Sequence, residues 1–406
     1  MNSYQTAGNM TCEITTSVPE PFAHCAGPRT ASLVVVGEAW GESEERNAGI
    51  PFCGASGHEF SKMLIETGWD DSRGTLARAV EAFEAHRFGE WLSLREEWLH
   101  NADIMLTNVF ALRPISNNLG YLCASKGDLG DAYNCPPVRT ENPRYVKTEY
   151  LSHLSRLREE VRAGPRNLLL CLGGTATWAM VGSSAIGRLR GAVCQSRDDA
   201  PMGLGGVKCL PTFHPAAIFR AWHWRVIVLA DLLKARRERE FPEVHRPLRS
   251  VIINPSLDQI ETWVEETLRG SFTLLSPDIE TMNGQIRCIG FARRRDESIV
   301  IPFISDLTGK SYWNNIDDEV MAWSYVQNLL DCPLPKIFQN GLFDLQYLIR
   351  AGLTVRNARH DTMLLHHVLY PEMQKSLGFL GSIYTNEMSW KLMRLHKGAE
   401  ELKRDE

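Results

Sequence analysis

The sequence predicts an α/β fold, a parallel sheet with flanking helices, which is followed by a domain of the α+β class. In the first part of the chain, short apolar runs that end in glycine or polar residues alternate with helical patterns. This alternation is typical of a parallel sheet. Pro242, Pro247 and Pro255 then interrupt a polar stretch, and we place a domain boundary there. Beyond it, strand patterns come in succession before helical patterns, an order that indicates an α+β domain.

Four buried strands are expected in the first domain, because each apolar run is short and is closed by loop residues. They cover residues 33–36, 103–108, 167–172 and 207–210. Helical patterns cover residues 60–68, 76–100, 149–162 and 227–240. Residues 114–145 hold many Asn, Gly and Pro and are expected to form a long surface loop. In a parallel sheet the ligand site lies beyond the carboxyl ends of the strands.

The second domain is expected to begin with a strand meander and to continue with helices. The strand patterns cover residues 272–279, 286–293 and 298–303, and the helical patterns cover roughly 317–330, 342–351, 361–369 and 376–384. The whole chain then divides into four parts. These are a flexible leader at 1–30, the first domain at 31–240, a linker and connecting helix at 241–270, and the second domain at 271–406.

The composition is that of an ordinary globular chain. It has 406 residues, of which 44% are hydrophobic and 23% charged, enough for two or three domains. The net charge of −5 neither supports nor excludes DNA as a partner, because only the surface that meets phosphate has to be basic. The ten cysteines form no CxxC pair, which argues against a zinc ribbon. They also follow no regular framework, so we expect reduced thiols in a reducing cytoplasm. No secretory signal or long apolar run is seen, so no membrane partner is expected.

Side chains with useful chemistry come after three of the predicted strands. Glu38 and Glu44 follow the first strand, and Phe52 lies in the loop beyond them. Asn108 ends the second strand, and His214 follows the fourth. An aromatic ring can stack on a base, and an amide can match the O4 and N3–H edge of uracil. A histidine can donate to an oxygen that becomes negative, and a glutamate can orient water or stabilise a sugar cation. Each residue alone is more often structural, so the prediction depends on their arrangement.

Four blocks of sequence, in order, resemble the motifs of the family 4 uracil-DNA glycosylases over roughly residues 30–240. The blocks are GEAWGESE at 37–44 with GIPFCG at 49–54, TNVF at 107–110 with Arg113-Pro114, LGGTA at 172–176, and PTFHPA at 211–216. The resemblance implies an enzyme that removes uracil from DNA, with uracil-containing DNA as its partner.

By this resemblance, four residues would form the slot for the base. Phe52 would stack on a uracil that has been flipped out of the DNA, because the glycosidic bond is out of reach inside a duplex. Asn108 would read the pairing edge of the uracil. Gly37 and Ala39 would also contact the substrate.

The resemblance assigns the chemistry to other residues. His214 would support the negative charge on uracil O2, and either Glu38 or Glu44 would assist water attack or stabilise the sugar cation. Arg220 would contact DNA from the loop at residues 214–225. The aromatic residues of that loop either enter the minor groove or simply pack.

Two features depart from the family pattern. Trp40 stands where the family usually has proline, which can reshape the water site. The family usually holds an iron–sulfur cluster on four spaced cysteines, and the spacing here does not match. The cysteines in question are Cys12, Cys25, Cys123 and Cys135. We therefore expect no iron–sulfur cluster.

The second domain carries three carboxylates in a pattern suited to a metal. Asp278 and Glu280 lie two residues apart, on one face of a predicted strand, and Asp344 lies near a helix start. Carboxylates of this kind bind Mg²⁺ or Mn²⁺, which can activate water for phosphodiester hydrolysis. The blocks resemble the first two motifs of the DEDD-type 3′–5′ exonucleases over roughly 272–391, which implies an RNase H-like α+β domain. Asp361 matches a helix-start position of that family and not a metal ligand.

The third exonuclease motif has no convincing copy. His396 and Glu400 have the spacing, but the carboxylate is the wrong one. The exonuclease-like domain can therefore be incomplete or inactive. The arrangement resembles the front part of a phage glycosylase–exonuclease–polymerase fusion, which implies a DNA polymerase or other replication proteins as partners and the cytoplasm of a bacterial host as the location.

Three functions are consistent with these patterns. The first is an active uracil-DNA glycosylase that is joined to an exonuclease-like domain. The second is a module that binds uracil or another modified base in DNA without cleaving it, which Trp40 favours. The third is mainly a nuclease, against which the missing motif argues.

Overall fold

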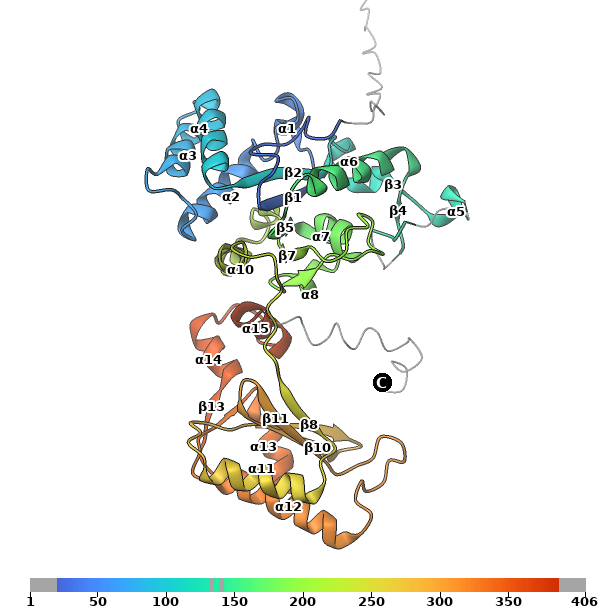
Figure 1. Ribbon diagram of the computed structural model, residues 1–406, viewed down its shortest axis with the longest axis vertical. Helices are drawn as coiled ribbons and strands as arrows, with labels where there is room; N and C mark the ends of the chain where they lie inside the picture. Colours follow the sequence, from blue (N-terminus) through green and yellow to red (C-terminus); the bar gives the residue numbers. More distant parts are fainter. Residues whose placement is uncertain (1–19, 131–134, 139–141, 387–406) are drawn as a thin grey trace, which may run out of the picture. The chain divides into compact units, whose positions relative to one another are not determined.

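The computed structural model describes residues 20–130, 135–138 and 142–386 (Figure 1). The chain forms two compact units. The first unit comprises the chain up to Val244 together with residues from Gly381 onward, and the second comprises His245–Leu380. We describe each unit by itself. Within the described residues, no helix combines the length and apolar character needed to cross a membrane.

The first unit is built on a five-stranded sheet with the order β2-β1-β5-β7-β6. Neighbouring strands are parallel, except that β6 is antiparallel to β7. The carboxyl ends of β1, β2, β5 and β7 therefore meet at one edge of the sheet. The strands are β1 (Leu33–Ala39), β2 (Ile104–Phe110), β5 (Leu168–Leu172), β6 (Cys194–Gln195) and β7 (Lys208–Thr212).

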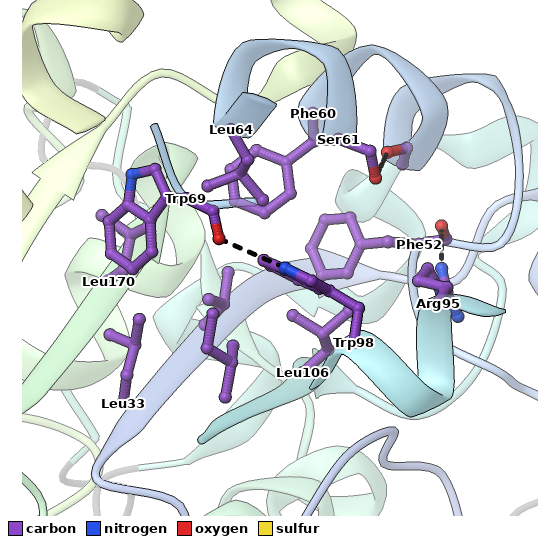
Figure 2. A pocket seen from close by; sticks show the side chains of 13 residues that line it. Leu33, Phe52, Phe60, Ser61, Leu64, Trp69, Arg95, Trp98, Leu106 and Leu170 are labelled. Atoms are coloured by element: carbon purple, nitrogen blue, oxygen red, sulfur yellow. Dashed lines mark hydrogen bonds between the residues drawn. The ribbon is translucent and has the colours of Figure 1, made fainter. Parts of the chain in front are cut away.

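Helices cover both faces of this sheet. Alternate residues of β1 point to opposite faces, so Val34 and Val36 join one hydrophobic cluster while Leu33 and Val35 join the other. The first cluster is completed by α6 (Leu151–Arg162) and α7 (Gly173–Val181). The second, part of which Figure 2 shows, is completed by α2 (Ala55–Glu66), α4 (Phe88–Asn101) and α10 (Arg225–Glu238). The predicted α/β fold with flanking helices is confirmed.

The structure refines several predicted boundaries. The helix predicted at 76–100 is two helices, α3 (Thr75–Glu84) and α4, because the chain turns at His86, whose φ is +57°. Helix α7 was not predicted, since Gly173 was interpreted as a stop although the helix begins there. The remaining elements of this unit are short. They are α1 (Glu42–Arg46), η1 (Ile115–Asn117), η2 (Leu119–Leu122), β3 (Cys123–Ala124), α5 (Lys126–Leu129), β4 (Tyr145–Val146), η3 (Thr148–Tyr150), α8 (Ile186–Leu189), α9 (Pro215–Ile218) and η4 (Trp222–Trp224).

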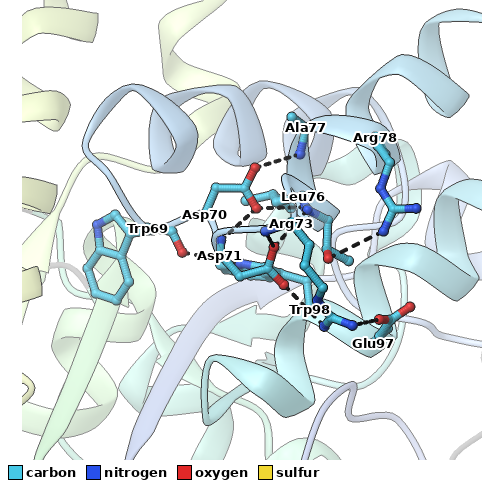
Figure 3. Close-up of polar contacts among 10 residues, drawn as sticks. Trp69, Asp70, Asp71, Arg73, Leu76, Ala77, Arg78, Glu97 and Trp98 are labelled. Atoms are coloured by element: carbon cyan, nitrogen blue, oxygen red, sulfur yellow. Dashed lines mark hydrogen bonds and ion pairs between the residues drawn. The ribbon is translucent and has the colours of Figure 1, made fainter.

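The start of α3 is fixed by the loop before it (Figure 3). The N-cap Gly74 offers no side chain, so Asp70 accepts hydrogen bonds from the backbone N–H groups of Leu76 (2.8 Å) and Ala77 (3.0 Å) instead. These contacts satisfy donors that a helix start leaves unpaired. The loop is also tied to α4, where the indole N–H of Trp98 donates to the carbonyl of Trp69 (3.2 Å). Helices α3 and α4 are thus held as a pair.

Residues that follow Gly381 complete the first unit. The side chain of Lys234 is only 2% exposed, and burial lowers its pKa to about 8. Its ammonium group donates to the carbonyls of Gly191 (2.5 Å), Ser382 (2.8 Å) and Thr385 (2.6 Å). Two of these three acceptors come from the returning segment, so this segment belongs to the structure of the first unit.

The second unit is an α+β domain, as predicted. Its four-stranded sheet has the order β8-β11-β10-β9, and α11, α12 and α13 contribute to its hydrophobic cluster. Strands β8, β12 and β13 were not predicted, because each has only three or four residues. The elements are β8 (Ser250–Ile253), α11 (Leu257–Arg269), β9 (Ser276–Met282), β10 (Gln285–Arg294), β11 (Glu297–Pro302), α12 (Ile316–Asp331), β12 (Lys336–Phe338), α13 (Gly341–Arg350), β13 (Ala358–Asp361), α14 (Thr362–Leu369) and α15 (Leu377–Tyr384), whose last residues fall in the first unit.

Candidate functional site

An open cleft of about 570 Å³ lies in the first unit, where the carboxyl ends of the parallel strands meet. This volume falls within the range of about 300–1,000 Å³ that small-molecule sites usually have. The residues predicted from the sequence that line it are Glu38, Ala39, Glu44, Phe52, Asn108, His214 and Arg220. Parts of the chain that are far apart in sequence thus contribute to a single cleft.

Gly37 allows two of these side chains to approach each other. A Cβ atom at Gly37 would lie 2.2 Å from Oδ1 of Asn108 and 2.6 Å from Cζ of Phe52. Both distances are far below van der Waals contact, so only glycine fits here. On the other side, the ring centroid of Phe52 lies 5.9 Å from that of His214, with 27° between the ring planes. The amide and the two rings therefore face the same space.

The backbone at Asn108 is held by a buried ion pair that sequence reasoning missed. Arg156 and Glu160 of α6 form this pair at 2.7 Å, and both side chains are almost completely buried. The guanidinium of Arg156 donates to the carbonyl of Asn108 and to that of Val109 (3.1 Å). Glu160 also accepts a hydrogen bond from Thr107 (2.8 Å). Charged residues on the inner face of an otherwise amphipathic helix were the available signal.

The two candidate glutamates have different partners. Glu38 accepts a hydrogen bond from the hydroxyl of Thr175, in the first turn of α7. Glu44 accepts one from the backbone N–H of Gly41 (3.0 Å), the N-cap residue of α1. Glu38 is therefore tied to the helix that follows the neighbouring strand β5, whereas Glu44 is tied to its own loop. Thr175 lies in one of the sequence blocks, but no role was predicted for it.

The hydrogen bonding of His214 defines its tautomer. Its Nδ1 accepts a hydrogen bond from the backbone N–H of Ala216 (3.2 Å), so the proton of the neutral ring is on Nε2. Burial lowers the pKa of His214 to about 4, and the charge of Arg220 adds to the shift. At neutral pH the ring is therefore uncharged and presents an N–H donor.

A second buried histidine makes stability depend on pH. Burial lowers the pKa of His153 to about 4, and its Nδ1 accepts from the N–H of Ala111 (3.1 Å). The unfolded chain binds a proton at this histidine near pH 6.5, whereas the folded chain does so only near pH 4. The stabilisation of the folded state by neutral His153 is therefore complete above pH 6.5 and is lost as the pH falls toward 4.

In thermal melts, we expect a His153→Gln variant, which keeps an acceptor, to lose less stability than the wild type between pH 6.5 and 4. Parallel curves for the two proteins would contradict this.

Trp40 lies at the wall of the cleft. Its ring packs edge-on against His24, with the centroids 4.6 Å apart. A Cβ atom at Gly49 would lie 2.3 Å from the indole, so glycine is needed to seat it. The indole lines the same cleft as Phe52 and His214.

The aromatic side chains of the loop at residues 214–225 differ in their exposure to solvent. Trp224 stacks on Phe213, with the ring centroids 4.5 Å apart, and therefore packs. Phe219 and Trp222 are 55% and 61% exposed. Arg220 lines the cleft. Packing is thus found for Trp224, and contact of Phe219 and Trp222 with the minor groove stays a prediction.

The cysteines considered for a cluster are only partly covered by the structure. Cys12 lies outside the described residues. Of the other three, Cys123 is buried, whereas Cys25 and Cys135 are partly exposed. Among the described residues, no three His, Cys, Asp or Glu side chains form a group that could hold a metal ion.

The carboxylates of the second unit influence one another without forming such a group. Asp278 is an exposed residue, but neighbouring atoms partly shield its carboxyl group from water. This desolvation raises the pKa of Asp278 to about 6, and the negative charges of Asp344 and Glu280 add to the shift. Asp344 is buried and accepts a hydrogen bond from the N–H of Ile279 (3.0 Å). Asp361 is the N-cap of α14, in agreement with its predicted helix-start position. In this arrangement the three predicted ligands do not fit a metal ion.

Solved structures similar to parts of this chain include RRP6, RNase D and EXD2. The catalytic core of RRP6 from Trypanosoma brucei is 15% identical over 35% of this chain and 38% of that chain, with a TM-score of 0.27. RNase D from Escherichia coli, an exoribonuclease, is 15% identical over 35% and 34%, with a TM-score of 0.26. The EXD2 exonuclease domain, soaked in Mn and GMP, is 19% identical over 33% and 68%, with a TM-score of 0.22. The chain thus spans little more than a third of RRP6 and RNase D.

The glycosylase-like part gives a direct family match. No curated protein matches the sequence. The family model described as the uracil DNA glycosylase superfamily matches residues 25–236. This region contains the parallel sheet and the whole cleft, and it makes up more than half of the chain. The chain therefore belongs to the uracil DNA glycosylase superfamily.

Proposed function

We propose that this protein is a uracil-DNA glycosylase of the family 4 type, which flips uracil out of DNA and hydrolyses its N-glycosidic bond. The proposed domain spans residues 31–240, after a leader at 1–30. The observation that carries the proposal is the single cleft lined by an aromatic ring, an amide, a carboxylate and a neutral histidine. These are the groups needed to stack on a pyrimidine, read its edge and stabilise its departure.

The first step is recognition of the base. Uracil leaves the base stack and enters the cleft, where Phe52 stacks on one face. The amide of Asn108 donates to O4 and accepts from N3–H. Gly37 and Ala39 form the wall beside it, and Arg220 contacts DNA phosphate at the rim.

The second step breaks the bond between N1 of uracil and C1′ of the sugar. The bonding electrons move onto the uracil, and the negative charge that builds on O2 receives a hydrogen bond from Nε2–H of His214. The carboxylate of Glu38, oriented by Thr175, stabilises the positive sugar and directs water to C1′. The water oxygen bonds to C1′, and its proton neutralises the uracil anion. We assign to Glu44 the supporting role of shaping the loop.

For the rest of the chain, we propose a linker with a connecting helix at 241–270 and an exonuclease-like domain at 271–406. Its expected ligands for Mg²⁺ or Mn²⁺ are Asp278, Glu280 and Asp344. Because these side chains do not form a metal-holding group, we derive no metal-dependent step. The pairing with a glycosylase suits a phage replication polymerase as partner in a bacterial cytoplasm, a reducing compartment in which cysteines stay reduced.

One assay separates the candidate activities. End-labelled single-stranded DNA with one uracil is incubated with the protein in EDTA or in Mg²⁺ and then treated with alkali. A break at the uracil position in EDTA supports the glycosylase. Shortening from the 3′ end only in Mg²⁺, lost in Asp278→Ala, supports the exonuclease. Intact DNA in both conditions overturns the proposed excision.

A binding module is the second candidate, and Trp40 at the wall of the cleft favours it. In that case the protein would retain uracil-containing DNA over matched thymine DNA in a filter-binding assay, without producing an alkali-labile site. Trp40→Pro would then restore excision if the indole alone prevents it.

Gly37→Ala should reduce excision by about a hundredfold, since a displacement of roughly 1 Å at a reacting centre can cost that much. The added methyl group would force Asn108 and Phe52 apart. Single-turnover excision rates would measure the effect. Gly89→Ala is the control, because no atom lies within 4 Å of a Cβ at that position. Equal rates for the two variants would contradict the close approach at Gly37.

A further inference from the structure

Phe52 adopts a backbone conformation that is unfavourable for its residue type. Its φ is +55°, in the left-handed region that non-glycine residues rarely occupy. The residue is also almost completely buried, and its ring lines the cleft. Such a conformation persists only where the surrounding structure enforces it. The residues that contact the backbone of Phe52 are therefore the ones expected to enforce this conformation.

Two side chains of α4 hold the carbonyl groups of this segment. The guanidinium of Arg95 donates to the carbonyl of Phe52, and the indole N–H of Trp91 donates to the carbonyl of Cys53 (3.0 Å). Trp91 and Arg95 are four residues apart and so lie on one face of the helix. Figure 2 shows Arg95 next to the Phe52 carbonyl, with their hydrogen bond drawn as a dashed line.

The position of the Phe52 carbonyl is confined from the opposite side as well. A Cβ atom at Gly57, in α2, would lie 1.7 Å from this oxygen. The carbonyl therefore fits between a glycine of α2 and the guanidinium of α4. We call Trp91, Arg95 and Gly57 the Phe52 clamp.

Arg95 is placed at a cost to folding. It is only 3% exposed, and no carboxylate of the described residues lies within ion-pairing distance of it. Burial lowers its pKa to about 10, and its Nε finds no hydrogen-bond partner in the part of the chain that the structure describes. Its other support is the ring of Trp91, whose centroid lies 5.1 Å from Cζ. A buried cation without an ion-pair partner disfavours folding, and an apolar residue would pack there at less cost.

We infer that Trp91 and Arg95 are positioning residues for base recognition, which hold the ring of Phe52 at the angle that the pyrimidine slot requires. The inference rests on the proposed function. The inference also gives helices α3 and α4 a role in uracil binding, although no residue of either helix lines the cleft. The two helices are held together at the loop that contains Asp70 (Figure 3).

The test compares Arg95→Met with Arg95→Lys, which keeps a donor, and with Arg78→Met, which removes an exposed arginine from α3. The melting temperature of Arg95→Met should equal or exceed that of the wild type. Its KM for uracil-containing DNA and its dissociation constant for free uracil should rise by about tenfold or more, since Phe52 contacts the base. Arg95→Lys should recover part of this loss, and Arg78→Met should show none.

A second readout does not depend on uracil. Cys53 is fully buried beside Phe52, so loosening the clamp should expose it. In Arg95→Met, its labelling by a thiol reagent, followed by peptide mass spectrometry, should accelerate by about tenfold as local opening becomes easier. Arg78→Met should label at the wild-type rate.

The outcomes separate the two proposals. If the wild type neither excises nor binds uracil, the proposed function fails, and the labelling of Cys53 still decides the clamp. If uracil affinity and labelling are unchanged in Arg95→Met, the clamp is wrong. A lower melting temperature with unchanged uracil affinity would also overturn it, because Arg95 would then act only in packing. In the Phe52→Leu background, Arg95→Met should cost little further affinity.

Discussion

Replacing His214 by alanine should slow the release of uracil from DNA by about two to three orders of magnitude, the usual effect of removing one donor to a developing oxyanion. The accepting bond at Nδ1 leaves the proton on Nε2, so the ring supplies that donor without carrying a charge. The measurement is single-turnover excision from end-labelled DNA at pH 7.5.

The matched control is His86→Asn, which changes an exposed histidine at a left-handed position that asparagine tolerates. It should excise at the wild-type rate. Because the pKa of His214 is about 4, the wild-type rate should show no histidine titration between pH 6 and 8. A His214→Ala enzyme within a few-fold of the wild type would remove the histidine from the mechanism.

The second large effect is expected from Asn108→Asp. A carboxylate only accepts hydrogen bonds, so it repels uracil O4 and loses the donor that the amide supplied. A site built around a hydrogen bond rejects a mismatched partner by about four orders of magnitude. Cytosine offers a donor at N4 that an aspartate can accept, so the variant should gain weak activity on cytosine. Excision from matched uracil and cytosine DNA measures both changes.

Asn117→Asp is the control for charge in the same cleft. Asn117 also lines the cleft, and its Oδ1 accepts a hydrogen bond from Arg113 (2.8 Å) that an aspartate would keep. This variant should retain most of its uracil excision. If both variants lose activity equally, the loss comes from the added negative charge and not from the pairing edge.

The sequence was a good guide to the fold wherever apolar runs were continuous. The four predicted strands correspond to β1, β2, β5 and β7, because strands buried on both faces read as unbroken apolar runs. The misses are local. Gly173 has a φ of +88° and begins a helix where glycine usually ends one. Two-residue strands such as β6 have no periodic pattern to detect.

For the cleft, the residues at the strand ends could be predicted, whereas their supports could not. Glu38, Phe52, Asn108 and His214 follow strands whose ends meet, so their common location was foreseeable. The supports come from elements whose position depends on tertiary packing. Thr175 reaches Glu38 across 137 residues of sequence, and Arg95 reaches Phe52 across 43. No local pattern encodes contacts of that range.

The buried ammonium group of Lys234 has a consequence for the order in which the chain folds during synthesis and for where it can be truncated. Two of its three acceptors, at Ser382 and Thr385, are synthesised after the entire second unit. A nascent chain that has reached only Val244 lacks them, and each unsatisfied buried group costs about 1–3 kcal/mol or more when charged. We therefore expect the first unit to be completed only once the returning segment has been synthesised. The contributions of the two units should accordingly be separated by point substitutions, since cutting the chain between the units removes part of the first.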